Sequence, residues 1–163
     1  MFASAKRRES SNYGIGTDGR VGLYVDEANR SWCSSDAAND HRAVTIEVAN
    51  DQIGGNWHVS DAALAKLVEL CTDICRRNGI KQLRFTGDKF GNLTMHKYFA
   101  ATLCPGPYLE GKFADIAQQV NENLAPQNTL YKVQVGAFSQ KANADAMLQK
   151  LKAAGFTGFI KYE

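Results

Sequence analysis

The chain has 163 residues, of which 44% are hydrophobic and 22% charged, a composition typical of one full globular domain with a small appendage. Lys and Arg number 19 against 17 Asp and Glu, for a net charge of +2, and this excludes the concentrated positive charge of proteins that bind duplex nucleic acid. No apolar run approaches about 18 residues, and Met1–Ser11 is basic and polar, so we expect neither a membrane span nor a signal peptide. The four cysteines form no CxxC pair, which indicates synthesis in a reducing compartment, the cytoplasm.

The first elements in chain order are strands. A β-hairpin is expected over Tyr13–Val25, because residues 16–19 read Gly-Thr-Asp-Gly between two segments with apolar residues at alternate positions. Strict alternation predicts a further strand over Ala43–Ala49, with its apolar residues on one face and Glu47 on the other.

A long amphipathic helix is expected next. Ser60 is a good N-cap, apolar residues then recur at helical spacing, and Gly79 is placed to end the helix. Cys71 and Cys75 lie one turn apart on its apolar face and resemble half of a metal site. No histidine or cysteine partner is near in sequence, so packing in the core is the preferred interpretation.

The first domain is completed by a short strand and a second helix. The strand is expected over Leu83–Thr86 and the amphipathic helix over Tyr108–Leu124. Residues 125–129, Ala-Pro-Gln-Asn-Thr, have the composition of a linker. The predicted first domain is therefore residues 1–124.

Residues 130–163 predict one small βαβ unit. A strand is expected over Tyr131–Gly136, a helix over Ala142–Ala154 and a last strand over Phe156–Tyr162. This segment holds five lysines against Asp145 and Glu163, a net charge of +3, so the rest of the chain sums to −1.

His96 and Cys104 are the first candidates for chemistry. They are eight positions apart, with Thr102 between them, and an imidazole and a thiolate are both good zinc ligands. A catalytic zinc takes three protein ligands and a water. Two donors do not make a site, so an incidental pair remains the alternative.

Glu47 is the candidate acid–base residue. It projects from the strand face opposite the apolar residues, and a carboxylate in that position can take a proton from water and pass it to a leaving amine. A solvated carboxylate on a strand face is the alternative. The other two histidines, His41 and His58, lie in polar loops and are expected to be exposed side chains rather than ligands.

Three motifs in this order resemble one family. They are Ser11-Asn12-Tyr13-Gly14-Ile15-Gly16-Thr17-Asp18-Gly19, Ala43-Val44-Thr45-Ile46-Glu47-Val48-Ala49-Asn50, and Thr94-Met95-His96 with Thr102-Leu103-Cys104-Pro105-Gly106-Pro107. Residues 1–124 resemble the type 2 N-acetylmuramoyl-L-alanine amidases, which include phage endolysins and peptidoglycan-recognition proteins. The resemblance implies an α/β fold with a mixed sheet flanked by helices.

The resemblance also implies an activity and a set of site residues. Members hydrolyse, with zinc, the amide between the lactyl group of N-acetylmuramic acid and L-alanine of the stem peptide. His96 and Cys104 match two of the three zinc ligands, Thr102 the residue that stabilises the oxyanion, and Glu47 the acid–base residue. The substrate-binding residues it implies are Tyr13, Trp32 and Asn50.

Departures from the family pattern imply weakened catalysis. The strand that carries the first zinc histidine has no counterpart after Met1, Ser11 stands where some relatives have a catalytic tyrosine, and Cys33 stands where several have a substrate-facing histidine. We therefore expect poor activity or none. A non-catalytic peptidoglycan-binding protein is the alternative, and a third hypothesis is a coding sequence that begins upstream of Met1.

The tail resembles a SPOR domain, a module that binds the glycan strands of peptidoglycan. The similar residues run from Tyr131 to Ser139, with Asn143-Ala144 and Leu151 to Phe156, and Gln134 and Phe138 are the binding residues implied. One βαβ half-module is present, so a homodimer through this half or through an exposed sheet edge is expected. The implied site of action is the bacterial cell wall, reached without a signal peptide through a phage-type membrane lesion.

Overall fold

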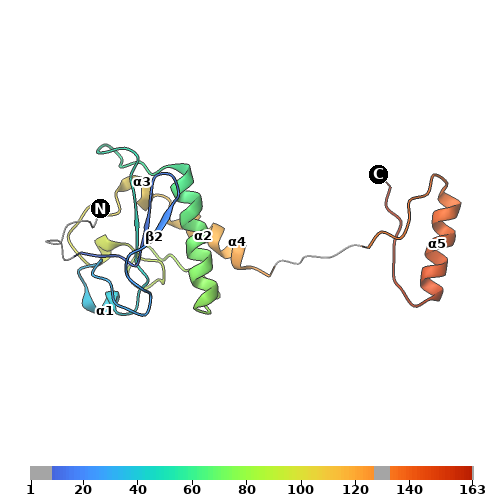
Figure 1. Ribbon diagram of the computed structural model, residues 1–163, viewed down its shortest axis with the longest axis horizontal. Coiled ribbons are helices and arrows are strands. Elements are labelled where there is room, and N and C mark those ends of the chain that lie inside the picture. The colour runs from blue at the N-terminus through green and yellow to red at the C-terminus, as the bar shows by residue number, and fades with distance from the viewer. Residues whose placement is uncertain (1–8, 127–132, 163) are drawn as a thin grey trace. The chain divides into compact units, whose positions relative to one another are not determined.

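A computed structural model describes residues 9–126 and 133–162. The chain divides into two compact units, Met1–Gln127 and Asn128–Glu163 (Figure 1). The first unit contains a sheet and its helices, and the second contains one helix. None of the helices in the described ranges is both long enough and apolar enough to cross a membrane.

The sheet of the first unit is small and mixed. Strands β1 (Tyr13–Ile15) and β2 (Val21–Leu23) pair antiparallel, and β3 (Ile46–Val48) pairs parallel with the other side of β1. The strand order is β2-β1-β3. The hairpin and the fold class are confirmed, although the third strand is shorter than the alternation predicts.

Buried polar side chains fix β3 against β1. The Asn12 side-chain oxygen accepts the backbone N–H of Thr45 (3.0 Å), and the Thr45 hydroxyl oxygen accepts the backbone N–H of Asn12 (3.0 Å). The Ser31 hydroxyl lies 2.7 Å from that of Thr45. All three residues are buried, and buried polar groups joined in this way set one register.

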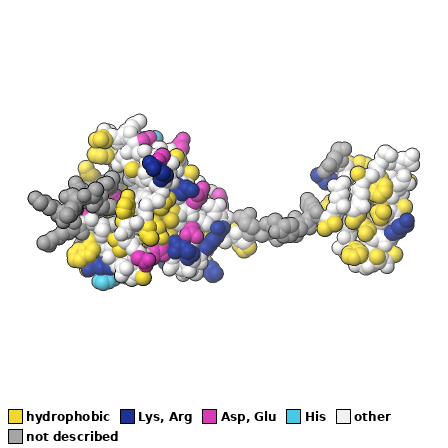
Figure 2. All heavy atoms as spheres, in the orientation of Figure 1, with side chains coloured by type: hydrophobic (Ala, Val, Ile, Leu, Met, Phe, Trp, Pro, Cys, Tyr) yellow, Lys and Arg dark blue, Asp and Glu magenta, His cyan; other side chains and the backbone are white. Residues whose placement is uncertain are grey.

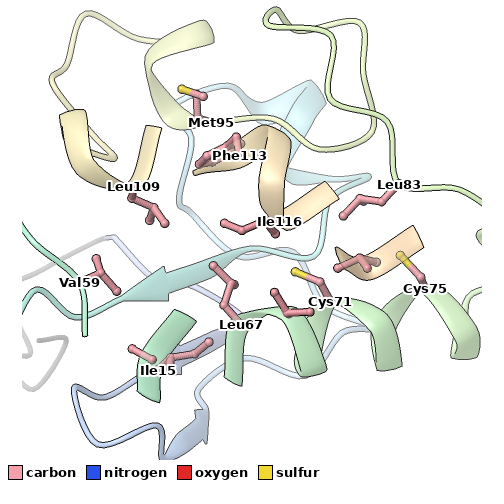
Figure 3. Packing of buried hydrophobic residues seen from close by; sticks show 13 residues of the cluster. Ile15, Val59, Leu67, Cys71, Cys75, Leu83, Met95, Leu109, Phe113 and Ile116 are labelled. Atoms are coloured by element: carbon pink, nitrogen blue, oxygen red, sulfur yellow. The ribbon is translucent and has the colours of Figure 1, made fainter. Parts of the chain in front are cut away.

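Helix α2 (Asp61–Arg77) packs against α4 (Phe113–Leu124) to make the core. The Ser60 hydroxyl caps α2 by accepting the Ala63 N–H (3.2 Å), and Gly79 follows the helix end at φ +66°. Figure 3 shows Cys71 and Cys75 on the face of α2 that turns toward α4. The interpretation of these cysteines as core residues is confirmed.

The segment Leu83–Thr86 is not a strand. Asn121 of α4 binds its backbone instead: the Leu83 N–H donates to Oδ1 (2.8 Å) and Nδ2 donates to the Leu83 carbonyl (2.9 Å). The next residue, Arg84, bonds to Asn92 through its N–H and its carbonyl. These bonds satisfy the groups that a neighbouring strand would otherwise pair, so the predicted strand is wrong here.

The expected helix over Tyr108–Leu124 is two helices. A one-turn helix, α3 (Pro107–Glu110), precedes α4, and Gly111 and Lys112 separate them. Gly111 lowers the preference for helix at the break. The apolar stripe of α4 is buried as predicted, including Phe113, Ile116 and Val120.

The second unit contains helix α5 (Lys141–Ala153), which confirms the predicted helix. The predicted strands are wrong over residues 133–136 and 156–162, which carry no strand; Tyr131 and Lys132 lie outside the described residues. Two strands beside one helix have little apolar surface to pack against. Large apolar side chains are accordingly exposed on this unit (Figure 2), namely Val133, Val135, Phe138, Phe156, Phe159 and Tyr162.

Candidate functional site

A cavity of about 400 Å³ opens beside β3 in the first unit. Glu47 from β3, His96 at the start of the 3-10 helix η1 (His96–Tyr98) and Cys104 from the turn before α3 all line it. Its deep wall is apolar and belongs to the core between α2 and α4 (Figure 3), with Leu67, Cys71, Met95, Leu109, Phe113 and Ile116. Three residues singled out as chemical from the sequence thus face one apolar hollow.

Glu47 is a half-buried carboxyl group in this cavity. Its burial raises its pKa above the ordinary value, and a hydrogen bond from Cys33 and the charge of His96 oppose that rise. The Cys33 thiol lies 3.7 Å from Oε1 and donates to it. A carboxyl group whose pKa is shifted upward in a cavity is suited to accept and return a proton.

The loop that precedes α1 (Ala37–Asp40) reaches the imidazole of His96. The Ser35 hydroxyl lies 3.4 Å from its Nε2. The buried Asp40 carboxylate holds this loop, because it accepts the Ser34 N–H (2.9 Å) and the Ser34 hydroxyl (2.7 Å). The imidazole is therefore positioned by a loop that itself has a fixed anchor.

Cys104 is a half-buried residue of the cavity lining. Burial, with the charge of Glu47, raises the pKa of its thiol to about 11. The Thr102 hydroxyl oxygen accepts the Cys104 backbone N–H (3.1 Å) and so supports the turn. Thr102 itself is not among the cavity-lining residues.

Cys33 was not chosen as a site residue from the sequence, yet the structure places it in the cavity against Glu47. Burial, with the charge of Glu47, raises the pKa of its thiol to about 12, so it is a neutral donor rather than a nucleophile. The signals in the sequence were its position after Trp32 and its match to a substrate-facing histidine of several relatives. Neither signal showed that Cys33 would contact Glu47 of β3.

The three expected substrate-binding residues of the first unit lie in different surroundings. Asn50 lines the cavity, and its Nδ2 donates to the carbonyl of Trp57 (2.7 Å). Tyr13 donates its hydroxyl to Glu27 (2.7 Å), and the exposed Trp32 lies outside the cavity lining. Trp57, which the sequence analysis did not single out, lines the cavity.

The cavity contains side chains of the types that bind zinc, but too few of them. His96 and Cys104 supply an imidazole and a thiol, but the described part of the chain contains no group of three His, Cys, Asp or Glu residues that could hold a metal ion. His41 is exposed and His58 pairs with Asp51 (2.7 Å), and neither lines the cavity. The site therefore falls one ligand short of the three that a catalytic zinc takes.

Comparison with known protein families shows the family of this chain. The family model described as N-acetylmuramoyl-L-alanine amidase matches residues 2–107, more than half of the chain. The chain belongs to the N-acetylmuramoyl-L-alanine amidase family. No curated protein and no solved structure matches the chain.

The amidase is joined to a wall-binding module. The family model for the SPOR domain matches residues 117–163, a range that begins inside α4 and includes the second unit. Gln134 and Phe138, the residues expected to bind glycan, are exposed on that unit. Both matches confirm the resemblances inferred from the motifs, and they agree on peptidoglycan as the polymer that is bound.

Proposed function

We propose that this amidase hydrolyses the N-acetylmuramoyl-L-alanine bond of peptidoglycan with zinc, and that its activity is weak because the described ligand set is incomplete. The observation that carries the proposal is the position of Glu47, a half-buried carboxyl with a raised pKa, in one cavity with His96 and Cys104. Zinc, when bound, supplies a Lewis acid. His96 and Cys104 are the residues that would hold it.

Three residues of the chain then have separate roles in hydrolysis. Glu47 takes the proton from the attacking water and returns it to the amine of L-alanine as that amine leaves. Cys33 orients the Glu47 carboxyl through its thiol. Thr102 keeps a hydroxyl two residues from Cys104, in the position proposed to stabilise the developing oxyanion.

The variant that tests this assignment is Glu47→Gln, which keeps the shape of the side chain and removes the base. We expect its hydrolysis rate to fall by about 10²–10⁴-fold, measured as new L-alanine amino termini released from purified peptidoglycan with added zinc. Glu122→Gln, an exposed change on α4, is the matched control. Equal rates for wild type and Glu47→Gln would overturn the role of Glu47.

Non-catalytic binding of peptidoglycan is the second candidate function. The lack of a three-donor metal group among the described residues favours it. Sedimentation of the chain with insoluble cell wall, with and without a chelator, separates the two functions. Binding that ignores the chelator, with no hydrolysis at any zinc concentration, would replace the enzymatic proposal by this one.

We further propose that the chain acts at the bacterial cell wall and self-associates there. The exposed apolar side chains of the second unit, such as Val133 and Phe159, support a second copy of the chain as a partner. The outer edge of β3, which pairs with no strand among the described residues, offers another surface for the same partner.

A further inference from the structure

Trp57 has a backbone conformation that a bulky residue rarely adopts. Its φ is +56°, and it and Ser35 (φ +61°) are the non-glycine residues with positive φ in the described ranges. Such a conformation costs about 1–3 kcal/mol and is kept where the surroundings enforce it. Both residues are at the cavity: Ser35 contacts His96, and Trp57 lines the cavity itself.

Contacts on several sides hold Trp57 in this conformation. Its N–H donates to the Gly54 carbonyl (3.0 Å), and its own carbonyl accepts from Asn50 Nδ2 (2.7 Å). Gly106 packs beneath it so closely that a Cβ there would lie 3.0 Å from the Trp57 Cβ. The backbone and Cβ of Trp57 are therefore held in place before any ligand arrives, which lowers the entropic cost of binding.

The indole ring is available to a ligand. It belongs to a residue that is 39% exposed, and none of the described residues accepts a hydrogen bond from its Nε1. It lines the same cavity as Glu47, His96 and Cys104. A flat apolar face with one free donor is suited to a ligand that has an apolar face and polar edges.

The charge of the cavity-lining residues further restricts the chemical class of the ligand. None of its described lining residues is Lys or Arg, so apart from the proposed zinc ion the cavity offers no strong partner for a carboxylate. A neutral acetamido sugar meets both conditions, because one side of its pyranose ring presents C–H groups and its hydroxyls and acetyl oxygen lie around the edge. The carboxylates of a stem peptide have no matching Lys or Arg here.

We propose that Trp57 is a sugar-binding residue of the amidase site: its indole stacks on the pyranose ring of the N-acetylmuramic acid whose lactyl amide is cleaved. This rests on the proposed function, since it takes Glu47, His96 and Cys104 as the position of the scissile bond. In this proposal the loop before α2 contacts the glycan part of the substrate, and Trp57 is a determinant of specificity.

Trp32 is the second fluorophore of the chain, and its emission has to be separated from that of Trp57. The chain has two tryptophans, and Trp32 is also exposed, at 57%, but lies outside the cavity lining. The guanidinium of Arg30 already covers its ring at 4.1 Å. Each tryptophan can therefore be left as the sole fluorophore, in Trp32→Phe and Trp57→Phe.

The first experiment titrates both variants of the full chain with N-acetylmuramoyl-L-alanyl-D-isoglutamine and with the sugar-free dipeptide. We expect the emission of Trp57 to shift with the sugar ligand and not with the dipeptide. A Trp57 shift of equal size with the dipeptide would place the stem peptide at Trp57 and overturn the proposal.

The second experiment uses Trp57→Gly, since glycine adopts φ +56° without strain and the variant removes the indole without a backbone penalty. We expect at least tenfold weaker binding of the sugar ligand by calorimetry, a raised KM with kcat nearly unchanged, and a thermal midpoint no lower than that of wild type. Phe90→Gly, at an exposed aromatic residue outside the cavity lining, should bind within twofold of wild type.

The outcomes separate this proposal from the proposed function. Wild type that hydrolyses peptidoglycan alongside a Trp57→Gly variant of unchanged KM and affinity overturns the role of Trp57 alone. Wild type that binds neither the sugar ligand nor insoluble peptidoglycan overturns the proposed function, and the assignment of Trp57 falls with it.

Discussion

Glu27 is the residue at which β1, the loop after β2 and the end of α2 are joined. Its carboxylate accepts the Tyr13 hydroxyl (2.7 Å) and two N–H groups of the Arg77 guanidinium (both 2.9 Å). The hydrogen bonds from Arg77 are the main reason that the pKa of Glu27 falls to about 2. Two parallel bonds to one guanidinium are the strongest form of such a pair.

Removing this charge should destabilise the first unit in a pH-dependent way. The carboxylate has its ordinary pKa of 4.5 when unfolded and about 2 when folded, so its stabilisation is present above pH 4.5 and is lost as the pH falls toward 2. Because Arg77 is 44% exposed, we expect Glu27→Gln to cost only about 1 kcal/mol at pH 7. Urea unfolding at pH 7 and at pH 2 measures this cost, and a cost that persists at pH 2 would contradict the assignment.

Single residues were predicted from the sequence where a motif carried them. Glu47, His96 and Cys104 came from motifs, and the structure brings these side chains to one cavity. Cys33 and Trp57 were not chosen, because their positions depend on loops closed by Asp40 and Asn50. Such side-chain bonds across loops leave no periodic pattern in a sequence.

At the scale of elements, the Asn121 side chain forms hydrogen bonds with backbone groups that a neighbouring strand would otherwise pair. It binds both backbone groups of Leu83 and joins α4 to an otherwise unpaired segment. We expect Asn121→Ala to lower the free energy of unfolding by about 1–3 kcal/mol, since two backbone groups lose their partner. Chemical denaturation measures it, and Gln118→Ala, an exposed change on the same helix, should stay within about 0.5 kcal/mol.

Elements with local signals were predicted best. Helix α2 has a capping serine, a clear apolar face and a following glycine, and its predicted limits agree with Asp61–Arg77. Strands depend on partners far away in sequence, and so the segments at Leu83 and in the second unit were predicted as strands without forming them. The break at Gly111 was hidden because the apolar spacing runs on across it.

At the scale of the whole molecule, the two units differ in how much they bury. The first has a core of apolar residues between α2, α4 and the sheet, whereas no residue described in the second unit is buried. A unit of this size without a core has little stability of its own. The second unit should therefore add little to the stability of the first.

Deleting residues 128–163 tests this independence. We expect the thermal midpoint of the first unit to change by less than about 2 °C, because its core is untouched. The same deletion should weaken concentration-dependent self-association, measured by size-exclusion chromatography with light scattering, and should weaken sedimentation with cell wall. A fall of the midpoint by 5 °C or more would show that the units stabilise each other.

The two hydrogen bonds between Asn12 and Thr45 affect which mutations the chain can accept as well as how it folds. Side chains alternate along a strand, so a shift of β3 by one residue against β1 would send the Glu47 carboxyl to the opposite face and put a neighbouring aliphatic group in its place. A codon gained or lost between Thr45 and Glu47 would therefore remove from the cavity the carboxyl group proposed as the acid–base residue. The chain should therefore tolerate substitutions along β3 far better than insertions or deletions.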